Sequence, residues 1–222
     1  MKMFILIFAA VISIATVYAD GVFPYVIKHY QFEEKTLKIE ISKMWKEGWY
    51  PRGISSDGKN GVSVMYVKAD FPLYADWLLK VSTTVSPSSI KQETMTDVKN
   101  GWMPADMTFA GGKTVYLYLK PKELIRIWDN GPGTAEILTL ETKYDTPVSA
   151  NYAPYALFYQ NGKPCAFKFS HSGGDELSWQ IKSYTGGDAA MMDDAAKMAA
   201  SGFQLWGIEK NGTAMTVLYV KY

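Results

Sequence analysis

Apolar residues near the start of this chain change from the spacing of a strand to that of a helix and back. Residues 25–30 are rich in aromatic and β-branched side chains and alternate enough with polar ones to predict a strand. A stripe at helical spacing, with Lys and Glu between its members, then predicts an amphipathic helix carrying Leu37, Ile41, Met44 and Trp45. Gly48 follows where helices commonly end in a left-handed residue.

Two further strands are predicted after this helix. Residues 49–54 and 62–68 combine aromatic and β-branched residues, and the segment between them contains Asp57-Gly58 and Asn60-Gly61. Both pairs are typical of hairpin turns, because such turns need backbone angles that Gly and Asn adopt easily. The sequence therefore predicts a unit with the order strand, helix, strand, strand.

A short phrase of this unit returns about every fifty residues, which is typical of repeat proteins. Gly48-Trp49-Tyr50-Pro51 has counterparts at residues 101–104, 151–154 and 202–205. Three copies also have a strand lysine upstream (Lys28, Lys80 and Lys182) and end in an aromatic-x-Lys sequence. We expect four tandem repeats, at residues 20–71, 72–121, 122–172 and 173–222.

Three of the four copies keep a helix pattern. The second begins its helix at Ser86-Pro87, a cap followed by proline in the first helical position. The fourth repeats the apolar stripe with Met191, Ala195, Met198 and Ala199. The third leaves no room for a full helix around residues 146–149. We expect an α+β fold of four βαββ repeats with a degenerate third repeat and an antiparallel-rich sheet that carries its helices on one face.

The last strand of each well-kept copy has two chemically different faces. Strand alternation places aliphatic residues on one face, namely Met65, Val67, Leu117, Leu119, Leu218 and Val220. We expect this aliphatic face to lie under the helices. The other face carries tyrosine and lysine, and is expected to be either a second buried layer or an exposed ligand-binding surface of Tyr66, Lys68, Tyr116, Tyr118, Lys120, Tyr219 and Lys221.

Aromatic residues recur at the start of the strand after each helix. Trp49, Trp102, Tyr152 and Phe203 are expected in equivalent core positions, because a recurring residue in a repeat protein commonly serves packing. The alternative role of the aromatic residues is recognition. Aromatic faces and lysine ammonium groups suit a carbohydrate or peptide ligand.

These features resemble the bacterial tandem repeat domain, a βαββ-like module that occurs in several copies in secreted proteins. The resemblance rests on the helix, the Gly-aromatic-x-Pro step at residues 48–51 and 101–104, and the hairpin with an aromatic end. The repeats of that family carry no known catalytic residues. The resemblance therefore implies an exported, non-enzymatic repeat protein that acts as a binding or scaffolding module.

The first nineteen residues have the pattern of a secretory signal peptide. Lys2 precedes an apolar run, and the run ends in Val17-Tyr18-Ala19, which fits a cleavage site after Ala19. Removing residues 1–19 leaves 22 basic and 22 acidic side chains. Such a balance argues against a nucleic-acid partner. We expect a secreted or periplasmic protein with an extracellular or periplasmic ligand and no membrane span after cleavage.

No catalytic or metal-binding motif stands out. The chain has two histidines, His29 and His171, and one cysteine, Cys165, without the spacings of a metal site, so neither a metal nor a cofactor is expected. The alternative hypothesis is a small secreted hydrolase. It would use the polar loop from His171 to Glu176, with His171 or Asp175 as its general base, because function is often inserted where a repeat departs from its pattern.

Overall fold

The computed structural model describes residues 25–57, 60–68, 74–122, 135–139, 148–150, 152–160, 163–170, 177–185, 187–211 and 214–221. The predicted signal peptide and the loop from His171 to Glu176 lie outside these residues. The described part is a mixed α+β structure, as the hydrophobic pattern predicts, with three helices and thirteen strands.

The same order of elements occurs in three parts of the chain. The first contains β1 (Tyr25–Gln31), α1 (Glu34–Lys46), β2 (Trp49–Ser56) and β3 (Gly61–Lys68). The second contains β4 (Tyr74–Ser82), α2 (Pro87–Lys99), β5 (Met103–Ala110) and β6 (Lys113–Pro121). The last contains β11 (Leu177–Tyr184), α3 (Gly187–Ala200), β12 (Gln204–Asn211) and β13 (Ala214–Lys221). Between them lie β7 (Ala135–Thr139), β8 (Val148–Ala150), β9 (Tyr152–Gln160) and β10 (Lys163–Ser170).

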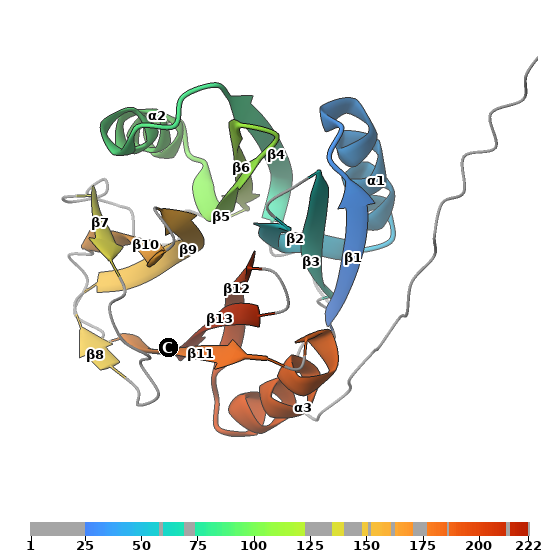
Figure 1. Ribbon diagram of the computed structural model, residues 1–222, viewed down its shortest axis with the longest axis vertical. Helices are drawn as coiled ribbons and strands as arrows, with labels where there is room; N and C mark the ends of the chain where they lie inside the picture. Colours follow the sequence, from blue (N-terminus) through green and yellow to red (C-terminus); the bar gives the residue numbers. More distant parts are fainter. Residues whose placement is uncertain are drawn as a thin grey trace, which may run out of the picture.

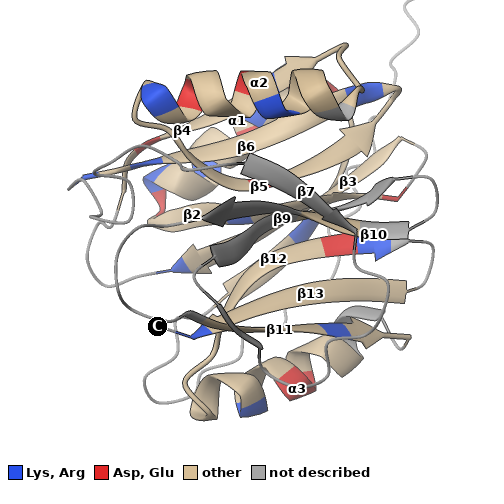
Figure 2. Ribbon diagram, turned by 90° about the vertical axis from the view of Figure 1, so that its left-hand side faces the viewer, with Lys and Arg blue, Asp and Glu red and all other residues tan. Residues whose placement is uncertain are grey.

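The strands form four small antiparallel sheets, ordered β1-β3-β2, β4-β6-β5, β7-β10-β9 and β12-β13-β11-β8. Figure 1 shows these sheets around a common centre, with β2, β5, β9 and β12 innermost and the helices outside. The expectation of one sheet with its helices on one face is wrong. The inner strands contact their neighbours around the centre without joining a common sheet, and each of the three helices among the described residues covers a face of its own sheet. Figure 2 accordingly shows α1 and α2 on one side of the strands and α3 on the opposite side.

Local signals set the helix ends as predicted. Ser86 Oγ accepts a hydrogen bond from the amide of Ser89, and Pro87 occupies the first turn of α2. Gly48, Gly101 and Gly202 follow the three helices with φ angles of 82°, 83° and 83°. Glycine adopts this left-handed conformation without the steric cost of a Cβ. None of the helices among the described residues combines the length and apolar content needed to cross a membrane.

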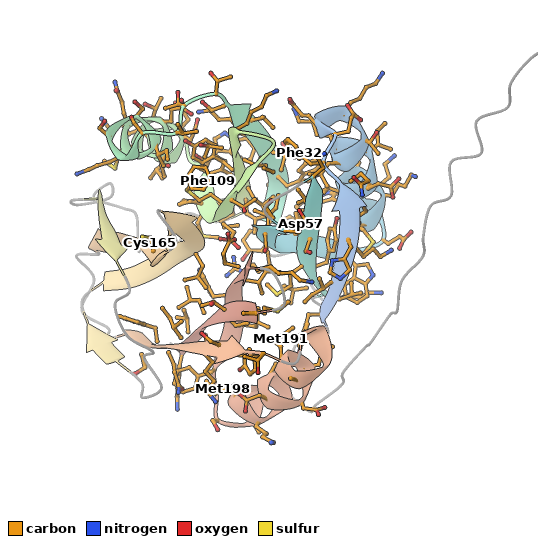
Figure 3. All side chains as sticks on the ribbon, in the orientation of Figure 1. Phe32, Asp57, Phe109, Cys165, Met191 and Met198 are labelled. Carbon is orange, nitrogen blue, oxygen red and sulfur yellow. The ribbon has the colours of Figure 1, made fainter. Side chains whose placement is uncertain are left out.

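The helices cover the tyrosine faces of their sheets, which is the reverse of the expected arrangement. Val64 and Tyr66 belong to the same core cluster as Leu37 and Ile41 of α1. Met65, from the opposite face of β3, lies instead in the cluster around α3. Figure 3 shows Met191 and Met198 of α3 lying toward the strands. The aliphatic faces therefore make the contacts between neighbouring sheets, where no polar group has to find a partner.

Candidate functional site

A single carboxylate joins the four inner strands at the centre of the molecule. Asp106 of β5 exposes 1% of its surface. Its Oδ2 accepts hydrogen bonds from the amides of Ile54 (3.0 Å, β2) and Ile208 (3.4 Å, β12), and its Oδ1 accepts from Met107 (2.9 Å, β5) and Leu157 (3.1 Å, β9). One side chain thus binds a backbone amide from each of the four sheets.

The space around Asp106 exists because its neighbours on other strands are small. A Cβ added at Gly53 would lie 3.3 Å from Asp106 Oδ2, and one added at Gly207 would lie 3.5 Å from it. Burial raises the pKa of the Asp106 carboxyl well above its usual range, while the four amide donors act in the opposite direction. The arrangement is closed to ligands, because the protein's own amides occupy both oxygens.

The inner strands run in the same direction past this carboxylate. Beyond it, Thr108 Oγ1 donates to Glu209 Oε1 (3.4 Å), and the amide of Lys210 donates to Ser55 Oγ (2.6 Å). These contacts join the second halves of β2, β5 and β12. Before it, Arg52 of β2 contacts Trp206 of β12, which joins their first halves. The strand starts therefore lie together at one end of the molecule, here called the entry end.

Arg52 is a buried charge at this end. It exposes 6% of its surface, and its guanidinium carbon lies 3.7 Å from the Trp206 ring centre and 5.6 Å from that of Tyr74. Among the described residues it forms no ion pair, and its Nη1 has no hydrogen-bond acceptor. Stacking on aromatic rings offsets part of the cost of burying this cation, and an anion would supply the missing acceptors.

The lysines predicted to bind ligand lie on the surface of the entry end. Lys68, Lys120 and Lys221 are exposed, and each Nζ approaches the aromatic ring that starts the adjacent inner strand. The distances to the ring centres are 5.4 Å for Trp49, 5.6 Å for Trp102 and 5.8 Å for Phe203. Trp49 and Trp102 are half-buried and Phe203 is buried, so the three rings occupy equivalent places beside a lysine but only Phe203 lies in the core. The side chain of Tyr152 lies outside the described residues.

The predicted tyrosines do not form a surface. Tyr66, Tyr118 and Tyr219 are fully buried, and Tyr116 exposes only 2%. These rings fill the space between sheet and helix, and some hydroxyls pair there, as Tyr30 and Tyr66 do at 3.1 Å. The expectation that these tyrosines form an exposed surface is therefore wrong. The lysines of the same face reach solvent only because they stand at the strand ends.

The interface between α2 and its sheet is more polar than those of α1 and α3. Lys80 Nζ lies 2.7 Å from Asp97 Oδ2 and 3.6 Å from Glu93 Oε2, and Ser82 Oγ donates to Glu93 Oε1 (2.9 Å). Lys80 pairs with Tyr116 across the sheet, where the corresponding lysines of the other two sheets pair with valine. The buried hydroxyls of Thr94, Tyr116 and Tyr118 form no hydrogen bond of good geometry among the described residues. Glu93 lies close enough to Tyr116, and Asp97 close enough to Tyr118, to help burial raise the pKa of these tyrosines.

The corresponding network under α3 is complete. Tyr184, two residues after Lys182, holds the place that Ser82 holds after Lys80. Its hydroxyl donates to Asp194 Oδ2 (2.7 Å) and lies 3.0 Å from the Tyr219 hydroxyl. Lys182 Nζ also donates to Asp194 Oδ2 (2.8 Å). The smaller Ser82 leaves the hydroxyls under α2 without such a partner.

The other candidate residues are structural. Cys165 of β10 is a buried thiol in the core cluster that contains Leu157 and Ala166, and Figure 3 shows it within the third sheet. His29 Nδ1 lies 2.7 Å from Ser63 Oγ across β1 and β3. Within the described part of the chain, no three His, Cys, Asp or Glu side chains converge as metal ligands would.

Comparison with known proteins adds no assignment. No protein-family model matches the sequence, and no curated protein matches it. The resemblance to the bacterial tandem repeat domain therefore remains a prediction.

Sequence reasoning missed both residues that distinguish the centre. The signal for Asp106 is visible when the copies are aligned on their glycine-aromatic phrase, because Gly53 and Gly207 stand at the same position. One acidic residue among small ones indicates a shared central space. The same alignment puts Arg52, Ala105 and Trp206 at one position, but it does not show that the guanidinium stacks on the Trp206 ring.

Proposed function

We propose that this chain is an exported, non-enzymatic binding module built from four related βαββ repeats, the third degenerate, closed around Asp106. The repeat boundaries are residues 20–71, 72–121, 122–172 and 173–222, and export follows cleavage near Ala19. The amides that Asp106 binds support the repeats, because Ile54, Met107, Leu157 and Ile208 follow one another at about the fifty-residue period of the sequence phrase.

The entry end supports a binding role. Three exposed lysines, each beside an aromatic ring, recur there at equivalent positions, and Arg52 adds a fourth cation nearer the centre. Aromatic rings with cations between them suit a ligand that combines apolar faces with negative charge, such as an acidic carbohydrate or peptide. The observation that carries this proposal is the set of three lysine–aromatic pairs at one end.

Arrays of carbohydrates and peptides test the binding role. The purified chain without residues 1–19 should bind acidic members, and the variant K68Q/K120Q/K221Q should bind them at least about tenfold more weakly. The matched control is K35Q/K91Q/K99Q, which removes exposed lysines from the outer helices. Equal losses of affinity in both variants would show that binding depends on net charge alone. If the chain binds no member of either array, the proposal is rejected.

Export has its own test. Mass spectrometry of the protein expressed with residues 1–19 should find a secreted form that begins at Asp20. Retention of an uncleaved chain inside the producing cell would contradict the proposed export.

A further inference from the structure

Arg52 differs from the other cations of the entry end in burial and in partners. The lysines there are exposed, so water satisfies their charges. Arg52 is 6% exposed, and its Nη1 is buried without an acceptor among the residues that the structure describes. Burying an ion costs several kcal/mol unless hydrogen bonds and an opposite charge compensate, so the protein alone leaves this cation under-satisfied.

Two aromatic rings occupy part of the space around the guanidinium of Arg52. At 3.7 Å from the ring centre, the guanidinium lies over the face of Trp206, and Tyr74 lies further away at 5.6 Å. A guanidinium stacked in this way keeps its N–H groups along its edge, where two parallel hydrogen bonds to one planar anion can form. A carboxylate has the matching geometry.

Asp106 does not fill this role. Both of its oxygens are held by backbone amides, and no contact between Asp106 and Arg52 is formed. The counterpart of Arg52 in the second sheet is Ala105, which follows Pro104 as Arg52 follows Pro51 and occupies the same bulge between β5 and β6. Because alanine occupies the equivalent bulge of the second sheet, the backbone conformation there does not require arginine.

We infer that Arg52, stacked on Trp206 at the entry end, binds a carboxylate group of the ligand. This inference rests on the proposed binding function and names the chemical group that is recognised. Trp206 holds the guanidinium in place, and Lys68, Lys120 and Lys221 attract the anionic ligand from solution. A phosphate could make the same paired hydrogen bonds, so the experiment includes it as a separate probe.

Acetate is the minimal probe, and thermal unfolding is the readout. Sodium acetate should raise the Tm of the chain without residues 1–19 above the effect of equal sodium chloride, and should not do so for R52M. R52M without acetate should have a Tm about 2–4 °C higher than the original protein, because it removes an unpaired buried charge while keeping side-chain volume. K35M, which replaces an exposed lysine, should match the original protein in both measurements.

Affinities for larger probes then test the carboxylate itself. An oligosaccharide of galacturonic acid should bind at least about tenfold more tightly than its carboxyl-reduced form, and R52Q should abolish that difference. R52K should keep part of it, because lysine retains the charge without the paired donors.

Each remaining result overturns the inference in a recognisable way. A Tm for R52M several degrees below the original would mean that the protein itself satisfies Arg52. If inorganic phosphate raises the Tm and acetate does not, the group that Arg52 binds is a phosphate and not a carboxylate. If the chain binds array members equally well with and without the carboxyl group, and R52Q does not change this binding, the binding function holds but Arg52 is not its carboxylate site. If no array member binds and acetate does not raise the Tm, both proposals are rejected.

Discussion

Two buried ionisable side chains, Asp106 and Arg52, lie on neighbouring inner strands and differ in their hydrogen-bond partners. Asp106 exposes 1% of its surface and accepts four amide hydrogen bonds, one from each sheet. Arg52 exposes 6% and has aromatic rings beside it, but no acceptor for its Nη1 among the described residues. Within the described part of the chain, the first arrangement is complete and the second lacks an anion.

The same contrast recurs among neutral groups beneath the helices. Under α3, the hydroxyls of Tyr184 and Tyr219 form a chain that ends at Asp194. Under α2, the hydroxyls of Tyr116 and Tyr118 are also buried, but among the described residues they form no hydrogen bond of good geometry. A buried polar group is therefore not informative by itself. A buried polar group with all its hydrogen-bond partners is structural, whereas one that lacks a partner is a candidate for binding a ligand.

The largest effect is expected from breaking the complete arrangement at the centre. D106N leaves one acceptor oxygen and turns an NH₂ group toward amide donors, so we expect the free energy of unfolding to fall by about 3–5 kcal/mol. Urea unfolding followed by circular dichroism measures this loss. The matched control is D76N, because exposed Asp76 accepts the amide of the next residue at 2.8 Å, much as Asp106 accepts that of Met107.

A rescue experiment sharpens the same prediction. D106G leaves the four amides facing an empty space of roughly the size of a carboxylate. Sodium formate should then raise the Tm of D106G beyond the effect of equal sodium chloride, and should not do so for the original protein. A loss below about 1 kcal/mol for D106N would show that the carboxylate is not what joins the sheets.

Local structure could be predicted from the sequence, because its causes are local. The glycines at 48, 101 and 202 end the helices as expected, and β1, β2 and β3 fall where alternation places them. The arrangement of the sheets could not be predicted in this way. Alternation identified the two faces of β3 but not which face meets a helix, since tyrosine is apolar enough to be buried and polar enough to be exposed.

The site shows the same limit. Lys68, Lys120 and Lys221 were identified because they end similar strands, and they do lie exposed beside aromatic rings. The role of Arg52 depends on Trp206, which is far away in the sequence. A single chain without related sequences gives no signal for such a contact.

Smaller effects are expected from matched tyrosine substitutions beneath the helices. Y184F removes the donor to Asp194 and leaves the fully buried hydroxyl of Tyr219 without its partner, so it should cost about 1–3 kcal/mol. Y118F removes a hydroxyl that lies near Thr94 and Asp97 but forms no hydrogen bond of good geometry among the described residues. The free energy of unfolding should therefore change by less than about 0.5 kcal/mol or rise. Urea unfolding of the two variants gives both values, and equal losses would mean that the hydroxyls under α2 are satisfied.

The smallest effect is a dependence of stability on pH that belongs to the α3 network. Although burial acts to raise the pKa of Asp194, hydrogen bonds from Lys182 and Tyr184 and the charge of Lys182 lower it below its usual value. A carboxyl whose pKa is lower in the folded state than in the unfolded state releases its proton on folding. Its contribution to stability is therefore present above the unfolded pKa of about 3.9 and is lost as the pH falls through the folded pKa.

The variant D194N isolates this contribution. The original protein should be more stable than D194N at pH 7, and the difference should shrink when unfolding is measured at pH 3. The exposed carboxyl of Asp76 forms no ion pair among the described residues, so D76N should give the same small difference at both pH values. If the difference in stability between D194N and the original protein were the same at pH 3 and pH 7, Asp194 would act through packing. Its contribution as an ionised partner of Lys182 and Tyr184 must weaken when the carboxyl is protonated.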